Sequence, residues 1–146
     1  MTQNAPSKIT LHATCVHVAG KAVLILGKSG SGKSALALQL IALGAELVSD
    51  DQTILNRQGD GVVASPPAAI AGMIEARNMG ILQVPHADDV PIELVVNMET
   101  DETERLPPNR EFELLGVSLP CLYHVRAPHF ASTILLYLKG AIIRSI

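Results

Sequence analysis

The sequence predicts an α/β domain in which a mixed β-sheet is flanked by helices. An uninterrupted apolar run at 22–26 indicates a strand that is buried on both faces. A turn rich in glycine follows it at 27–34, and apolar residues then recur at helical spacing from Leu36 until Gly44. Strand, turn and helix in this order are the start of a unit that packs a helix on a sheet.

The chain has the length of one ordinary domain, with 146 residues. We therefore expect a single domain over residues 1–146, with residues 1–7 flexible. The composition is 48% hydrophobic and 17% charged, which is typical of a compact globular fold. The net charge of -3 provides no basic stripe, so nucleic-acid binding lacks electrostatic support.

Two further features bear on localisation. Cys15 and Cys121 lie in strand-like segments without metal-ligand spacing, and no signal-peptide pattern begins the sequence. Both observations predict a cytoplasmic protein. The apolar segment 130–146 is shorter than 18 residues and contains Lys139 and Arg144, so it predicts a packed terminal helix and no membrane span.

The other elements follow from alternation, composition and turn residues. We expect strands at 8–19, 46–48, 53–56, 61–65, 81–84, 91–97 and 121–125, a helical segment of small residues at 66–75, a polar loop at 99–111, and a terminal helix from about residue 128.

The glycine-rich turn matches the pattern G-x-x-x-x-G-K-[ST] at every position. Glycines let the backbone N–H groups surround a phosphate, and the helix that follows adds the positive end of its dipole. In this pattern Lys33 reaches the β and γ phosphates, and Ser34 offers a hydroxyl to Mg²⁺. A Gly/Ser-rich turn before a helix cap is the alternative, but it leaves the Gly-Lys-Ser ending unexplained. The predicted nucleotide-binding residues are Gly27, Lys28, Ser29, Gly30, Ser31, Gly32, Lys33 and Ser34.

Two adjacent carboxylates follow the strand after this helix. Asp50 and Asp51 lie at its C-terminal end, the edge where open α/β sheets bind ligands. A carboxylate near Mg²⁺ and phosphate can orient a hydroxyl and accept its proton. The alternative is that both aspartates cap a turn before the next hairpin. The phosphate loop favours the catalytic interpretation.

The remaining polar residues are less informative. His12 precedes the phosphate-loop strand and is either a core histidine or a partner of an aspartate; the sequence alone favours the core. Glu75 and Arg77 are by default solvated charges at a helix end. The other four histidines show no metal-ligand spacing.

Four blocks at family-specific spacing resemble the catalytic domain of bacterial HPr kinase/phosphorylase, in a short form without its N-terminal domain. The blocks are LHATCV, GKSGSGKS, GAELVSDD and IEARNMGILQV, and the similarity runs from about His12 to Ile143. The resemblance implies a fold like that of phosphoenolpyruvate carboxykinase. It also implies ATP- and Mg²⁺-dependent phosphorylation of a serine on the phosphocarrier protein HPr, with reversal driven by phosphate, so that phosphate and pyrophosphate are further expected ligands. Such an enzyme regulates the sugar or nitrogen phosphotransferase system.

The resemblance also implies roles for individual residues. Asp51 accepts the serine proton and returns it in the reverse reaction, assisted by Asp50. His12 and Lys33 match active-site positions, while Ser34 and Glu75 match positions that hold Mg²⁺.

Three arginines complete the implied site. Arg77 lies in the signature used by both reactions, and Arg105 resembles the arginine needed for phosphoryl transfer. Arg126 falls in the loop used for dephosphorylation. This sequence departs from the family pattern at Ala35, where an acidic residue is usual, at Asn78, where glycine is usual, and at His129, where arginine is common.

Two other functions fit the same residues. One is a small-molecule kinase that uses the polar loop at 99–111 as a substrate lid. The other is a nucleotide-sensing module without catalysis, acting through a regulatory partner such as a two-component regulator. The sequence leaves open whether the chain forms a homo-oligomer.

Overall fold

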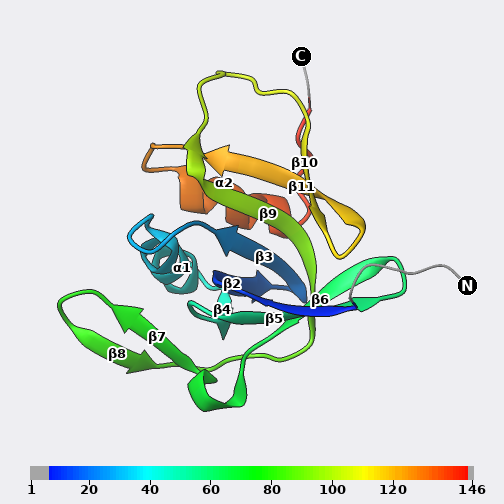
Figure 1. Cartoon of the computed structure of the whole chain (residues 1–146). Helices are drawn as coiled ribbons and strands as arrows, with labels where there is room; N and C mark the ends of the chain where they lie inside the picture. Colours follow the sequence, from blue (N-terminus) through cyan, green and yellow to red (C-terminus); the bar gives the residue numbers. More distant parts are fainter. Residues whose placement is uncertain (1–6, 145–146) are drawn as a thin grey trace, which may run out of the picture.

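The computed structural model describes residues 7–144 and shows a mixed α/β fold. Within that range the chain forms a curled nine-stranded mixed sheet, a two-stranded β7–β8 hairpin, two α-helices and one turn of 3₁₀-helix (Figure 1). The elements are β1 Lys8–Leu11, β2 Ala13–Val18, β3 Lys21–Leu26, α1 Lys33–Ala42, β4 Glu46–Ser49, β5 Thr53–Gln58, β6 Gly61–Ser65, η1 Ala68–Ile70, β7 Met73–Ala76, β8 Gly80–Gln83, β9 Val90–Asp101, β10 Arg110–Leu114, β11 Val117–His124 and α2 Phe130–Leu138.

The sheet is organised around the long strand β9. It pairs in parallel with β3 and with β11, while its first residues pair antiparallel with β6. From β9 the order continues through β3 and β2 to β4 on one side, and through β6 and β5 to β1 on the other. Strands buried on both faces consist of continuous apolar residues, as in the run 22–26, which forms β3.

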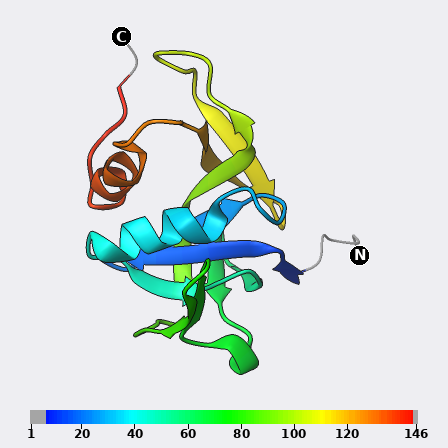
Figure 2. The ribbon, with the colours of Figure 1, turned by 90° about the vertical axis from the view of Figure 1, so that its left-hand side faces the viewer.

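Two apolar clusters lie on the two faces of this sheet. Helices α1 and α2 cover one face, where Leu40 and Ile134 pack with Ile25 and Val96 (Figure 2). The opposite face is closed by the sheet itself, because β5, β6, β10 and β11 curl over Leu24. The apolar residues Leu36 and Ala37 near the start of α1 belong to the first cluster.

Helix α1 has glycines at both ends. Gly32 precedes it with φ 99°, and Gly44 follows it with φ 115°, a backbone region that disfavours side chains. The N–H groups of Gly44 and Ala45 donate to the carbonyls of Ile41 and Leu40, at 3.0 Å each. These are the two bonds of a Schellman motif, so the predicted stop at Gly44 is confirmed.

The structure corrects three expected elements. Residues 66–75 do not form a helix: a single 3₁₀ turn leads into β7, which contains Glu75. The expected strand 8–19 is two strands with a bend at His12. Helix α2 ends at Leu138, short of the expected segment to 146. Residues 145–146 lie outside the described range, as do residues 1–6, on which the expectation of a flexible start mainly rests.

The expected polar loop 99–111 is shorter than predicted. Its first residues extend β9 to Asp101 and its last begin β10 at Arg110. Arg110 binds Glu102 through two bonds of 3.0 Å and lies 4.1 Å over the ring of Tyr123. The sequence hides this pairing because the two charges, eight residues apart, look like ordinary solvated groups. The loop of 102–109 is therefore tied at its base.

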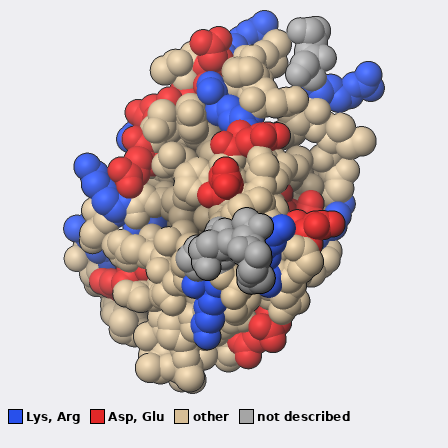
Figure 3. All heavy atoms as spheres, turned by 45° about the vertical axis from the view of Figure 1, so that its right-hand side comes forward, with Lys and Arg blue, Asp and Glu red and all other residues tan. Residues whose placement is uncertain are grey.

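Both cysteines are buried and free of disulfides, and burial raises the pKa of each thiol. None of the helices within residues 7–144 has the length and apolar character needed to cross a membrane. On the face drawn in Figure 3, the basic and acidic side chains that the structure describes are interspersed. That face presents no single-sign field for a nucleic acid.

Acid should weaken the fold through Glu102. The hydrogen bond from Arg110 lowers the pKa of Glu102 below its ordinary value of 4.5; burial opposes it, and the Glu104 and Thr103 N–H groups reinforce it. Because the unfolded carboxyl takes up its proton first, the stabilisation is present above pH 4.5 and is lost as the pH falls through the folded pKa. Urea unfolding between pH 7 and pH 3 should show a smaller pH dependence for Glu102→Gln, whereas Glu113→Gln, an exposed control on β10, should follow the unmodified chain.

Candidate active site

The glycine-rich loop joins β3 to α1 and has the backbone that its sequence predicts. Gly27, Gly30 and Gly32 all have positive φ, at 156°, 85° and 99°. A side chain at Gly27 would collide with Ser31 and would lie 3.1 Å from Met98. Glycine is thus required here for close packing as well as for backbone freedom.

Lys33 lies at the start of α1 and is almost completely buried, with 6% of its surface exposed. Its ammonium group donates to the Lys28 carbonyl of the same loop at 3.1 Å. A buried cation with one neutral partner leaves two of its donors unused by that bond. The loop therefore presents a positive charge at the point where its backbone curls.

Asp50 joins three elements through its carboxylate. The hydroxyls of Ser34 and Thr14 donate to Oδ1 at 2.7 and 3.0 Å, and the Glu75 N–H donates to Oδ2 at 3.1 Å. These donors come from α1, β2 and β7, respectively. Only 7% of Asp50 is exposed, so the bonds satisfy a charge that burial would otherwise penalise.

Asp51 differs from Asp50 in exposure, backbone conformation and hydrogen-bond partner. Its side chain is 61% exposed, its φ is 68°, and its Oδ1 is hydrogen-bonded to Nε2 of His12. His12 lies on the bend between β1 and β2, and its side chain is 45% exposed. The core alternative for His12 is therefore wrong, and the alternative of an aspartate partner is confirmed.

The β7–β8 hairpin supplies two further charged side chains. Glu75 and Arg77 are exposed, as expected, but they lie on and directly after the strand β7 and not at a helix end, and both line the same hollow as the loop residues. The hairpin turn contains Asn78 at φ 66°. Asparagine tolerates this left-handed conformation better than most residues, which explains how it replaces the glycine expected there.

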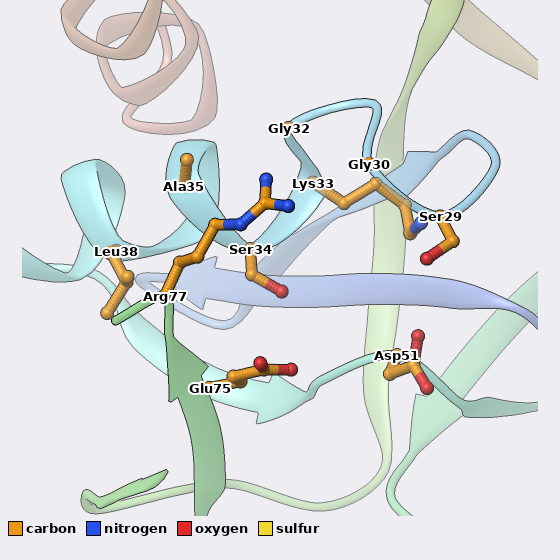
Figure 4. A pocket seen from close by; sticks show the side chains of 10 residues that line it. All are labelled: Ser29, Gly30, Gly32, Lys33, Ser34, Ala35, Leu38, Asp51, Glu75 and Arg77. Carbon is orange, nitrogen blue, oxygen red and sulfur yellow. The ribbon is translucent and has the colours of Figure 1, made fainter. Parts of the chain in front are cut away.

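These elements surround a hollow of about 480 Å³ (Figure 4). In Figure 4 the Ser34 hydroxyl and the Glu75 carboxylate point into the space between the loop and Asp51, and the Arg77 guanidinium rises toward the loop. The lining residues are Ser29, Gly30, Gly32, Lys33, Ser34, Ala35, Leu38, Asp51, Glu75 and Arg77.

A second hollow, of about 360 Å³, lies on the other flank of the loop and contains Arg126. Both oxygens of Asp101 accept from Nε of Arg126 at 3.0 Å. His124 lies in the same hollow, and its Nδ1 is buried 3.7 Å from Asp101, too far for a hydrogen bond. Burial and the Arg126 charge lower the pKa of His124, with Asp101 acting in the opposite direction.

The structure brings most of the predicted residues together around the first hollow, while Arg126 lies in the second. Arg105 lies exposed in the loop of 102–109 and lines neither hollow. Thr14, which the sequence analysis missed, contacts both aspartates. In the sequence it is a polar residue between the apolar Ala13 and Cys15, within the block LHATCV.

The residues present suit a magnesium ion that is shared with phosphates. Ser34 gives its proton to Asp50, which leaves its lone pairs free to face the hollow beside Glu75. Within residues 7–144 no group of three or more His, Cys, Asp or Glu side chains could hold a metal without help. Magnesium is commonly bound by one or two protein oxygens plus phosphates and water, so the donor set is sufficient.

Fold and site together define a mixed α/β protein with a glycine-rich loop between a buried parallel strand and a helix, facing a pair of aspartates. Comparison with known proteins agrees with this class. The family model of the HPr serine kinase C-terminal domain matches residues 3–126. The chain therefore belongs to the HPr serine kinase C-terminal domain family.

Individual relatives show the same similarity. The HPr kinase/phosphorylase of Caldicellulosiruptor bescii is 37% identical over 135 residues, covering 84% of this chain and 43% of that protein. The HPr kinase/phosphorylase of an Azoarcus species is 34% identical, covering 99% and 50%. The solved structure of the Hpr(Ser) kinase/phosphatase from Coxiella burnetii matches with a TM-score of 0.77 at 26% identity, over 90% of this chain and 95% of that one. The chain spans about half the length of the curated relatives it matches.

The two aspartates should differ sharply in their effect on stability. An amide in Asp50→Asn cannot accept from all three donors, so one buried group loses its partner and unfolding should become easier by about 1–3 kcal/mol. Asp51→Asn changes an exposed side chain and should stay within about 0.5 kcal/mol of the unmodified chain. Urea denaturation of both variants measures the difference; equal losses would show that Asp50 has no special structural role.

Proposed function

We propose that this domain binds ATP with Mg²⁺ in the hollow beside the glycine-rich loop and transfers the γ-phosphoryl group to a serine of the phosphocarrier protein HPr. The observation that carries the proposal is that Asp51 and Ser34 line one hollow with Lys33, while Asp50 ties the elements that bear them. The names of the relatives support HPr as the acceptor.

The loop supplies the means to hold a polyphosphate. Its backbone N–H groups and the N-terminus of α1 favour negative charge, and Lys33 adds an ammonium group within the curl. Phosphate oxygens would take over from the Lys28 carbonyl as the partner of Lys33. Because of this loop and its lysine, we assign the fold to the P-loop class, in the HPr kinase and phosphoenolpyruvate carboxykinase-like group.

Ser34 and Glu75 are the residues that would hold Mg²⁺. When bound, the ion would neutralise charge on the phosphates during transfer. Asp50 keeps Ser34 oriented for this task, because it accepts the hydroxyl proton and leaves the oxygen lone pairs facing the hollow. Arg77 adds a second positive charge on the opposite wall.

Asp51 receives the proton of the acceptor serine. As the serine oxygen forms its bond to the γ phosphorus, the bond between that phosphorus and the bridging oxygen breaks and ADP leaves. The proton passes to Asp51, whose Oδ1 is held by His12 while Oδ2 takes no hydrogen bond from the described residues. His12 thus orients the base, and Asp50 assists by fixing the chain before it.

In the reverse reaction, orthophosphate attacks the phosphoserine phosphorus, the bond from that phosphorus to the serine oxygen breaks, pyrophosphate forms, and Asp51 returns the proton to the serine oxygen. The second hollow would supply a cation on the other flank of the loop, because Arg126 lies there, held by Asp101. A role for Arg105 requires the loop of 102–109 to approach the site once HPr is bound. We treat the chain as one domain, since both apolar clusters share the central strands. Its proposed role is the regulation of the phosphotransferase system.

Removing the proton acceptor should separate binding from transfer. Asp51→Asn should lose HPr phosphorylation by about 10²–10⁴-fold, the range for general base catalysis, while it still binds ATP. The measurement is intact mass of HPr after incubation with the chain, ATP and Mg²⁺, together with calorimetry of ATP binding. Asp60→Asn, in the exposed turn between β5 and β6, is the matched control and should transfer normally.

Transfer by Asp51→Asn at the unmodified rate would refute its assigned role. Tight ATP binding without any turnover by the unmodified chain would favour the nucleotide-sensing alternative. Phosphorylation of small acceptors but not of HPr would favour the small-molecule kinase.

A further inference from the structure

Thr14 is a buried polar residue that touches both aspartates. It lies in β2 with none of its surface exposed. Its Oγ1 donates to Oδ1 of Asp50 at 3.0 Å and accepts from the backbone N–H of Asp51 at 3.2 Å. One oxygen therefore contacts the carboxylate of the first aspartate and the main chain of the second.

The chemistry of a hydroxyl fixes the direction of both bonds. Thr14 has one proton, and the ionised carboxylate of Asp50 can only accept, so that proton goes to Asp50. The lone pairs that remain can only accept, and the Asp51 N–H is the donor they meet. Both capacities of the hydroxyl are used, and a methyl group in its place would leave two groups without their partner.

Asp51 needs such a restraint because its backbone is unusual. A φ of 68° is uncommon outside glycine, although aspartate adopts it more readily than most residues, and the surroundings decide whether it persists. Two other bonds act nearby: the Gln52 N–H donates to the Asp50 carbonyl at 2.7 Å, and the Ser49 hydroxyl donates to the Gln52 carbonyl. Of these three bonds, only that of Thr14 is made to Asp51 itself.

We propose that Thr14 is a positioning residue for phosphoryl transfer. By holding the Asp51 amide and the Asp50 carboxylate at once, it keeps the Asp51 side chain aimed into the hollow that Ser34 and Lys33 line. The inference rests on the proposed function, since it assumes that Asp51 serves the acceptor hydroxyl. It adds a residue on β2 to the site, which otherwise consists of His12, the loop, the aspartate turn and the β7–β8 hairpin.

Thr53 provides a matched control on a neighbouring strand. It is equally buried, and its hydroxyl donates to the Ala13 carbonyl at 2.8 Å. That bond ties β5 to β2 but reaches neither aspartate. Replacing either threonine by valine keeps the shape and removes one buried hydroxyl, so the two changes share the loss of a buried bond and differ in the link to Asp51.

The test compares Thr14→Val, Thr14→Ala, Thr14→Ser and Thr53→Val in the full chain. Thr14→Val and Thr14→Ala should lower kcat for HPr phosphorylation by about 10²-fold, the effect of misplacing a catalytic group by about 1 Å, with an ATP Kd close to that of the unmodified chain. Thr14→Ser retains the hydroxyl and should restore most of kcat. Thr53→Val should lower Tm without a comparable loss of kcat.

A second measurement makes the result independent of turnover. The backbone amide of Asp51, followed by NMR, should change its shift and exchange faster in Thr14→Val and Thr14→Ala, and should be retained in Thr14→Ser and Thr53→Val. A normal kcat in Thr14→Val and Thr14→Ala, an equal loss of kcat in Thr53→Val, or an unchanged Asp51 amide in Thr14→Val and Thr14→Ala would overturn the inference. If the unmodified chain phosphorylates nothing, the proposed function fails, and the amide measurement alone decides whether Thr14 positions Asp51.

Discussion

The site depends on the buried carboxylate of Asp50. It accepts one hydrogen bond each from Ser34 on α1, Thr14 on β2 and the Glu75 amide on β7, three elements that are distant in sequence. The same three elements pack in one apolar cluster, and Asp50 adds the polar link between them at the site. Because Asp50 is buried, its charge has lost most of its contact with water, and the loss of any one hydrogen-bond donor would destabilise the fold.

In the proposed mechanism the two adjacent aspartates have different tasks, one structural and one chemical. Asp50 is committed by its three bonds and has little capacity left for a substrate. Asp51 turns outward through a left-handed backbone and keeps one oxygen available while His12 holds the other. The pair lies beyond the end of β4 at Ser49, in a bend and not on an extended strand. The turn after β4 places the Asp50 carboxylate among buried donors and leaves the Asp51 carboxylate exposed.

Elements set by local sequence patterns could be predicted, whereas those that depend on contacts between distant residues could not. The loop at 27–34, helix α1 and the strands on either side follow from short-range periodicity, glycine placement and a fixed motif. The helix predicted for residues 66–75 was wrong. Small residues after two prolines favour a helix locally, but pairing with β8 makes the end of this segment a strand. Thr14 was missed because its partners lie 36 and 37 residues away, beyond any spacing rule. Family resemblance, and not periodicity, pointed to Glu75.

The most direct test of the central claim is a crystal structure of the chain with a non-hydrolysable ATP analogue and Mg²⁺. We expect the β and γ phosphates within the curl of the loop, Lys33 turned from Lys28 onto them, and the Ser34 hydroxyl still donating to Asp50 while its oxygen faces the ion. A polyphosphate bound elsewhere, or Asp50 separated from Ser34 in the complex, would contradict the account.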